Sequence, residues 1–259
     1  MKSPLLRPAG YSVGRKSEEA LIDVMLYFMF SMLMPALIGN GYLLSIVLGV
    51  GRSNVTSAGI YSLAALGSMV WALNKAVSTL RIRRDYRLGW EGELAVGEEL
   101  AQLSGQGFRV FHDVPDEGFN IDHVVVGPSG IYAIETKART KRGTEKDAHQ
   151  VGYDGKTLKF PDYVTDQPLV QAERQAKSLG RWLSKASGIA LAPVPVVIIP
   201  GWFVDRTGKG RVQVLAVNGA RHYLSASREG SSLDRSQIER IAYQLELKCR
   251  DVALGEQLI

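Results

Sequence analysis

Two long apolar stretches near the start of the chain most constrain its fold. Residues 24–50 carry no charge, and Ser31, Asn40 and Ser45 are their only clearly polar members. Residues 55–73 are also uncharged and follow the short polar segment 51–54. A helix of roughly 20 apolar residues spans a bilayer core, where only a helix or a closed barrel satisfies the backbone. These stretches predict a helical hairpin with two transmembrane helices, at about residues 24–48 and 55–75.

The charges beside these stretches predict an orientation. Basic residues cluster before the first stretch and after the second, and only Arg52 lies between them; the flanking residues are Lys2, Arg7, Arg15, Lys16, Lys75, Arg81, Arg83, Arg84 and Arg87. The positive-inside rule then places both termini in the cytoplasm, in a multi-pass protein of the inner (cytoplasmic) membrane. Residues 81–87 are expected to lie against anionic headgroups of the lipid bilayer.

Small residues in the second stretch allow close helix packing, and they permit a homo-oligomer through the transmembrane hairpin. The alternative to a membrane hairpin is a buried pair of soluble helices. A cleaved signal peptide is disfavoured, because the first apolar run is too long and a second one follows.

The net charge of +5 and the pI near 9.3 invite a nucleic-acid interpretation, but the distribution of charge weakens it. Residues 1–90 hold ten Lys/Arg and four Asp/Glu, whereas residues 91–259 hold twenty-one and twenty-two. A basic contact surface in the second part must therefore be local, for example Lys137, Arg139, Lys141, Arg142 and Lys146. The single cysteine, Cys249, excludes an intrachain disulfide and a cysteine cluster for zinc.

From residue 89 the pattern becomes globular. It predicts a helix over 90–103, strands over 108–114, 120–126 and 131–137, and a hairpin near Asp154 and Gly155. An amphipathic helix over 168–185, strands over 195–200 and 211–217, and a final helix over 234–248 follow. The strand reached through the amphipathic helix should lie parallel to a neighbour. The expected fold is a central mixed sheet flanked by helices.

Three charged residues stand on this expected sheet. Asp122 ends the motif Asn-Ile-Asp, and Glu135 and Lys137 end the next strand on one face, since alternate strand residues point the same way. Two neighbouring carboxylates can hold Mg²⁺, and a lysine beside them can orient or deprotonate a water. An ordinary surface pair is the alternative, but the apolar frame around these charges favours a central hairpin. The side chain of His123 is expected on the opposite face of the strand from that of Asp122, and His123 is interpreted as a structural residue.

These motifs resemble the PD-(D/E)XK nuclease core, and more closely the nuclease-related domain, NERD. The matching stretches are residues 92–100, 120–128, 130–137 and 167–171, and the similarity covers roughly residues 89–200. The resemblance implies that Asp122 and Glu135 are the metal ligands, with Mg²⁺ (or Mn²⁺) as cofactor. It implies that Lys137 positions or activates the attacking water, that Glu93 assists at the metal, and that Gln171 lies nearby. Glu98 and Glu99 are alternatives to Glu93.

The expected domains are a membrane anchor over 1–88, a nuclease-like core over 89–204, and a strand–helix extension over 205–259. The expected function is a membrane-anchored, cytoplasmic, metal-dependent nuclease that hydrolyses phosphodiester bonds, with DNA as the expected nucleic-acid partner. The alternative function is a catalytically inactive nuclease-fold module that binds nucleic acid or a protein partner at the membrane.

Overall fold

The computed structural model describes residues 6–49, 55–141, 149–226 and 232–250. Contacts divide the chain into two units, which are considered separately: Val13–Arg87 form one, and Met1–Ser12 with Leu88–Ile259 form the other.

The unit of residues 13–87 consists of helix α1 (Tyr11–Val47) and most of helix α2 (Val55–Ala101). The two helices contact each other through Tyr27 and Trp71, whose ring centroids are 6.1 Å apart, and through Tyr42 and Tyr61 at 5.1 Å. Both helices are long and apolar enough to cross a membrane, and only 6% of each apolar window is buried. A buried soluble pair would cover most of that surface, so the low burial favours the predicted spans. The predicted turn at 51–54 lies outside the described residues.

Helix α2 is longer than expected. The predicted second span and the predicted helix over 90–103 are one continuous helix to Ala101, followed by a 3₁₀ turn, η1 (Gln102–Gln106), that ends at Gly107 in the left-handed region. The charged segment between them contains no proline and is rich in arginine, a good helix former, so nothing interrupts the helix at residue 88.

The globular unit is built on a five-stranded sheet in the order β1-β2-β3-β7-β9. Its strands are β1 (Arg109–Asp116), β2 (Phe119–Gly127), β3 (Gly130–Thr136), β7 (Val194–Ile198) and β9 (Gln213–Leu215). The first three are antiparallel, and β3, β7 and β9 are parallel. The predicted parallel strand and the predicted mixed sheet with flanking helices are thus confirmed.

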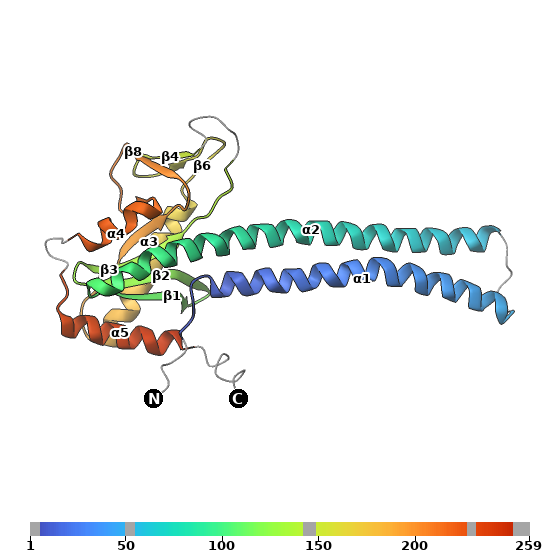
Figure 1. Ribbon diagram of the computed structural model, residues 1–259, viewed down its shortest axis with the longest axis horizontal. Helices are drawn as coiled ribbons and strands as arrows, with labels where there is room; N and C mark the ends of the chain where they lie inside the picture. The colour runs from blue at the N-terminus through green and yellow to red at the C-terminus, as the bar shows by residue number, and fades with distance from the viewer. Residues whose placement is uncertain (1–5, 50–54, 142–148, 227–231, 251–259) are drawn as a thin grey trace. The chain divides into compact units, whose positions relative to one another are not determined.

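Helices cover both faces of this sheet (Figure 1). Helices α3 (Gln167–Ser187) and α5 (Arg235–Cys249) pack on one face through a core that includes Leu179 and Ile241. The end of α2, η1 and α4 (Val217–Ser225) cover the other face around Tyr132.

A second sheet, in the order β6-β5-β4-β8, was not predicted beyond its hairpin. It contains β4 (Gln150–Tyr153), β5 (Leu158–Lys159), β6 (Val164–Thr165) and β8 (Phe203–Arg206), drawn together in Figure 1. Its side chains pack with Leu169 of α3 and Val197 of β7 in a third core. Strands of two to four residues carry too little periodicity to be recognised in a sequence.

Candidate active site

Strand β3 carries the centre of the site. All seven of its residues are buried, and Glu135 is 5% exposed near its carboxyl end. The strand lies between β2 and β7, so its backbone is hydrogen-bonded on both sides. A carboxylate on such a strand is held rigidly, as a preorganised site requires.

Asp122 faces Glu135 at the point where β2 and β3 stop pairing. The antiparallel register pairs His123 with Ile134 and would next place Asp122 opposite Glu135, but the ladder ends there. Instead, Oδ2 of Asp122 accepts a hydrogen bond from the backbone N–H of Thr136 at 2.6 Å. The side chain of Asp122 thus replaces a backbone acceptor and lies beside Glu135.

Two amides of helix α3 hold Glu135. Nε2 of Gln171 donates to Oε2 of Glu135 at 2.7 Å, and Nε2 of Gln175 donates to the same oxygen at 2.8 Å. Gln175 is fully buried and also donates to the backbone carbonyl of Asn120 at 3.3 Å. Sequence reasoning singled out Gln171 and missed Gln175, although the spacing of four residues places both on one helix face.

Glu93 reaches the site from α2. It is 5% exposed, and its charge is close enough to contribute to the raised pKa of Asp122. The preceding Gly92 permits this approach, because a Cβ there would lie 2.6 Å from Cβ of Ala138. The alternatives lie elsewhere: Glu98 is exposed, and Glu99 pairs with Arg221.

Lys137 follows β3 directly. Its backbone N–H donates to the carbonyl of Ile198 at 2.9 Å, and its side chain is exposed. Its positive charge is close enough to lower the pKa of Glu135. Three of the five residues proposed from sequence therefore lie near the other two: Glu93, Lys137 and Gln171 are close to Asp122 and Glu135.

The electrostatics of the two carboxyl groups are unfavourable to a double negative charge. Burial raises the pKa of Asp122 well above its usual range, and the carboxylates of Glu135 and Glu93 raise it further. Burial also raises the pKa of Glu135, against the opposing effects of Gln175, Lys137, Gln171 and Arg174. A nearby cation would relieve this repulsion.

The residues present fit a divalent cation of the hard, oxygen-binding type. Asp122 and Glu135 supply carboxylate oxygens, and Oε1 of Gln175 is a buried amide oxygen with no hydrogen-bond partner among the described residues. Within the described ranges no three or more His, Cys, Asp or Glu residues group closely enough to bind a metal by themselves. Mg²⁺ does not require such a group, because it commonly takes one or two carboxylates and keeps water or substrate phosphate as its other ligands.

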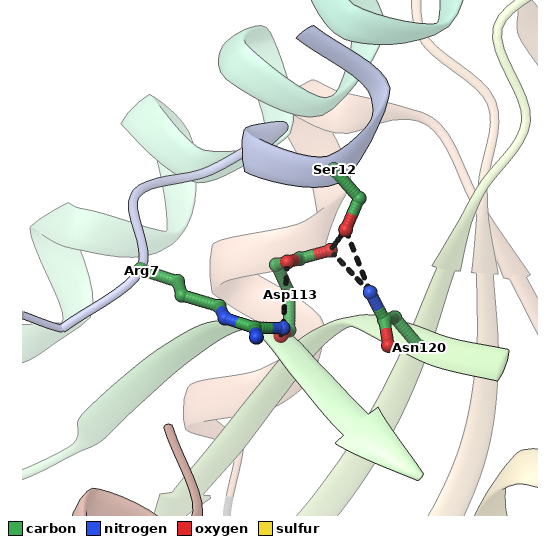
Figure 2. A network of polar contacts seen from close by, with 4 residues as sticks. All are labelled: Arg7, Ser12, Asp113 and Asn120. Carbon is green, nitrogen blue, oxygen red and sulfur yellow. Dashed lines mark hydrogen bonds and ion pairs between the residues drawn. The ribbon is translucent and has the colours of Figure 1, made fainter. Parts of the chain in front are cut away.

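A polar network joins Arg7 and Ser12, near the start of the chain, to Asp113 and Asn120 (Figure 2). Asp113 of β1, 3% exposed, pairs with Nη1 of Arg7 at 3.2 Å and accepts hydrogen bonds from Ser12 and from Nδ2 of Asn120. The carbonyl of Asn120 in turn accepts from Gln175. Residues 6–12 thus support β2 where it delivers Asp122, a role that no sequence motif signals.

Comparison with known proteins identifies one family. Residues 88–200 match the family model described as the nuclease-related domain, NERD. Neither the curated proteins nor the solved structures give a match. The matched range contains every carboxylate and amide described above, and a domain of this kind generally implies the use of a divalent metal.

Proposed function

We propose, from the premise that residues 88–200 of this chain are a nuclease-related domain, that the protein is a metal-dependent nuclease anchored in the cytoplasmic membrane. The observation that carries the proposal is the meeting of Asp122 and Glu135 at the point where β2 and β3 stop pairing.

The described residues have distinct roles in phosphodiester hydrolysis. Asp122 and Glu135 would hold Mg²⁺ or Mn²⁺, which when bound acidifies water and offsets charge on phosphoryl oxygens. Gln171 and Gln175 fix the orientation of Glu135, as partners of metal ligands commonly do. The Lys137 ammonium group offsets the negative charge that develops on the phosphate and orients the attacking water. Glu93 assists beside Asp122.

DNA cleavage by the full chain tests the proposal. Purified protein in detergent micelles is incubated with plasmid DNA and Mg²⁺, Mn²⁺ or a chelator. We expect metal-dependent nicking or linearisation that is lost in Glu135→Ala and Lys137→Ala. The matched controls are Glu98→Ala and Lys156→Ala, which remove the same charges from exposed positions. Equal activity in all variants would refute the assignment.

The inactive binding module is the second candidate, and the two amides that already occupy Oε2 of Glu135 favour it. It predicts nucleic-acid binding that survives Glu135→Ala and no cleavage with any metal.

The cleavage assay also tests the choice of nucleic acid. Repeating it with RNA substrates decides between DNA and RNA.

The membrane assignment rests on two helices that are long and apolar enough to cross a membrane, with 6% of each apolar window buried within the described residues. We propose the cytoplasmic membrane, with both termini and the nuclease domain in the cytoplasm. The protein should stay in the membrane fraction after alkaline carbonate extraction, and protease should cleave the domain only from the cytoplasmic side. Crosslinking tests whether the hairpin also forms a homo-oligomer.

A further inference from the structure

A groove of about 860 Å³ runs along helix α3, outside the carboxylate site. One wall is α3, and the other is formed by the segment that leads into β7 and by Arg211. Its floor is apolar, with Ala176, Gly180, Pro193 and Pro195 among its lining residues. The groove has room for part of an extended ligand.

Basic side chains dominate the rim of this groove. Arg174, Lys177, Arg181 and Arg211 are all exposed, and Glu173 is the one acidic residue among the lining side chains. None of the four cations forms an ion pair with a carboxylate of the described residues. Because residues 91–259 hold nearly equal numbers of acidic and basic residues, this local excess is a departure from its surroundings.

The spacing of three of these cations suits a phosphate backbone. Arg174, Lys177 and Arg181 stand at positions i, i+3 and i+7, so they lie on one face of α3. Seven residues of helix span roughly 10 Å, and the same length measured along the axis of a B-form duplex holds about three phosphates of one strand.

The groove leads to the carboxylates. Gln171 and Gln175, which hold Glu135, belong to the same helix as the three cations. Arg174 stands at the near end, because it lies between Gln171 and Gln175 in the sequence of α3, and both of these amides donate to Glu135. A strand lying on the three cations would therefore continue toward Asp122 and Glu135.

The basic run expected after β3 is a weaker candidate. Arg139 is committed to a bidentate pair with Asp162, at 2.7 and 2.6 Å, and its guanidinium lies 3.8 Å from the ring centroid of Tyr163. Arg142 and Lys146 lie outside the described residues, which leaves Lys137 and Lys141 of that run.

We propose that the groove formed by α3 and the segment before β7 binds the sugar–phosphate backbone of one nucleic-acid strand and guides it to Asp122 and Glu135. The proposal rests on the nuclease function proposed above and adds the path of the substrate. A bilayer surface is the other large polyanion, but it is flat and would contact protruding cations, whereas these four line a recess.

Binding without cleavage tests the proposal. The full chain in micelles is titrated against a fluorescent single-stranded DNA in chelator, with the salt concentration varied. The groove variant is Lys177→Gln/Arg181→Gln/Arg211→Gln, which leaves Arg174 beside Glu135 intact. We expect at least a tenfold weaker affinity at low salt, and a slope of log affinity against log salt that is smaller by about 2.

The matched control removes three exposed cations elsewhere: Arg206→Gln/Lys209→Gln/Arg240→Gln. We expect it to bind as the unmodified chain does, because these three residues do not line the groove. Its net charge falls by the same amount as that of the groove variant, so the comparison separates position from total charge. An equal loss of oligonucleotide affinity in the two variants would overturn the proposal that the groove is the specific binding site. Loss of binding in neither variant would also overturn it. No binding by the unmodified chain would refute the nuclease proposal itself, which is a different result.

A second experiment tests whether the groove binds anionic lipid instead of nucleic acid. The oligonucleotide titration is repeated in nanodiscs of neutral lipid and of lipid with added phosphatidylglycerol. If the groove binds nucleic acid, the lipid should not change the ratio of affinities between the unmodified chain and the groove variant. If anionic lipid competes with the oligonucleotide in the unmodified chain but not in the groove variant, the groove is a lipid site and the proposal is wrong.

Discussion

Asp122 combines a buried setting with two neighbouring carboxylates, and this makes the site unstable as an ionised cluster. Because the folded-state pKa of Asp122 lies above its unfolded value, burial of this carboxyl group disfavours folding at neutral pH; the penalty shrinks as pH falls below the folded pKa and is absent below the unfolded pKa. Catalytic sites commonly retain such strain at the expense of stability.

Asp122→Asn should therefore stabilise the metal-free protein while abolishing cleavage, since the amide oxygen can still accept from the N–H of Thr136. We expect the melting temperature at pH 7 to rise by roughly 2–4 °C, the shift that about 1 kcal/mol gives in a domain of this size. Added Mg²⁺ should raise the melting temperature of the unmodified chain and not that of the variant. A fall in the melting temperature without metal would contradict the account.

Gln175 is assigned here as a positioning residue. Its hydrogen bond lowers the pKa of Glu135, so Gln175→Met should raise that pKa at similar side-chain volume. We expect cleavage to fall about 10- to 100-fold, and the acidic limb of the pH–rate profile to move to higher pH. A purely structural role would lower the rate without moving the limb. Ser178→Ala on the same helix serves as the control.

Among the secondary-structure elements, α2 packs closely against the segment that follows β3, where Gly92 lies next to Ala138. Gly92→Ala would put its Cβ 2.6 Å from Cβ of Ala138 and push Glu93 away from Asp122. We expect a loss of stability of about 1–3 kcal/mol and a loss of cleavage of about 100-fold. The double variant Gly92→Ala/Ala138→Gly restores the space and should recover most of both. Failure of this exchange would show that Gly92 matters for another reason.

Strands β1 and β2 are joined on their other face by a histidine pair. Nδ1 of His112 and Nδ1 of His123 lie 2.8 Å apart, so one ring donates and the other accepts. Burial lowers the pKa of both, and the neighbouring ring lowers that of His123 further. The interpretation of His123 as a residue facing away from Asp122 agrees with this contact.

The pair predicts sensitivity to acid. Below about pH 6.5 the unfolded chain takes up protons that the folded pair refuses, so the contribution of the pair to the free energy of unfolding should decrease as pH falls from 7 to 5, opposite in sign to the contribution of Asp122. His123→Leu should flatten this dependence, whereas His222→Leu, at an exposed position, should not. Urea unfolding at several pH values measures it. An unchanged slope in His123→Leu would assign the acid sensitivity to other groups.

At the scale of the whole molecule, residues 6–12 are separated from β1 by about a hundred residues yet supply partners of a buried carboxylate. Arg7→Met should destabilise the globular unit by roughly 3 kcal/mol, because Asp113 would keep a buried charge without its cation. Asp113→Asn in the same chain should restore much of the stability. Thermal melting followed by fluorescence measures both. A fragment beginning at residue 88 should show the same defect.

Much of the fold follows from periodicity. The three antiparallel strands, the amphipathic helix and the parallel strand were predicted near their observed positions, because each is long enough to show its period. The two apolar helices were also predicted, but α1 begins at Tyr11, before the expected start at about residue 24, and α4 was not predicted. The continuity of α2 through residue 88 was not predicted, because a helix that continues and a helix that begins show the same period. The small second sheet was not predicted either, because its short strands resemble a loop in the sequence. The boundaries of the domains stay predictions.

Residue types and their spacing were therefore enough to predict two uncharged helical segments, a sheet with charges at the ends of two strands, and the Asp, Glu and Lys residues that suit phosphodiester chemistry. Which of these groups meet depends on the packing of the folded chain. It placed Gln175 and Arg7 in the support of the site, and it gathered Arg174, Lys177, Arg181 and Arg211 along one groove. Local periodicity reports which face a residue occupies, whereas contacts between distant segments depend on how the faces pack.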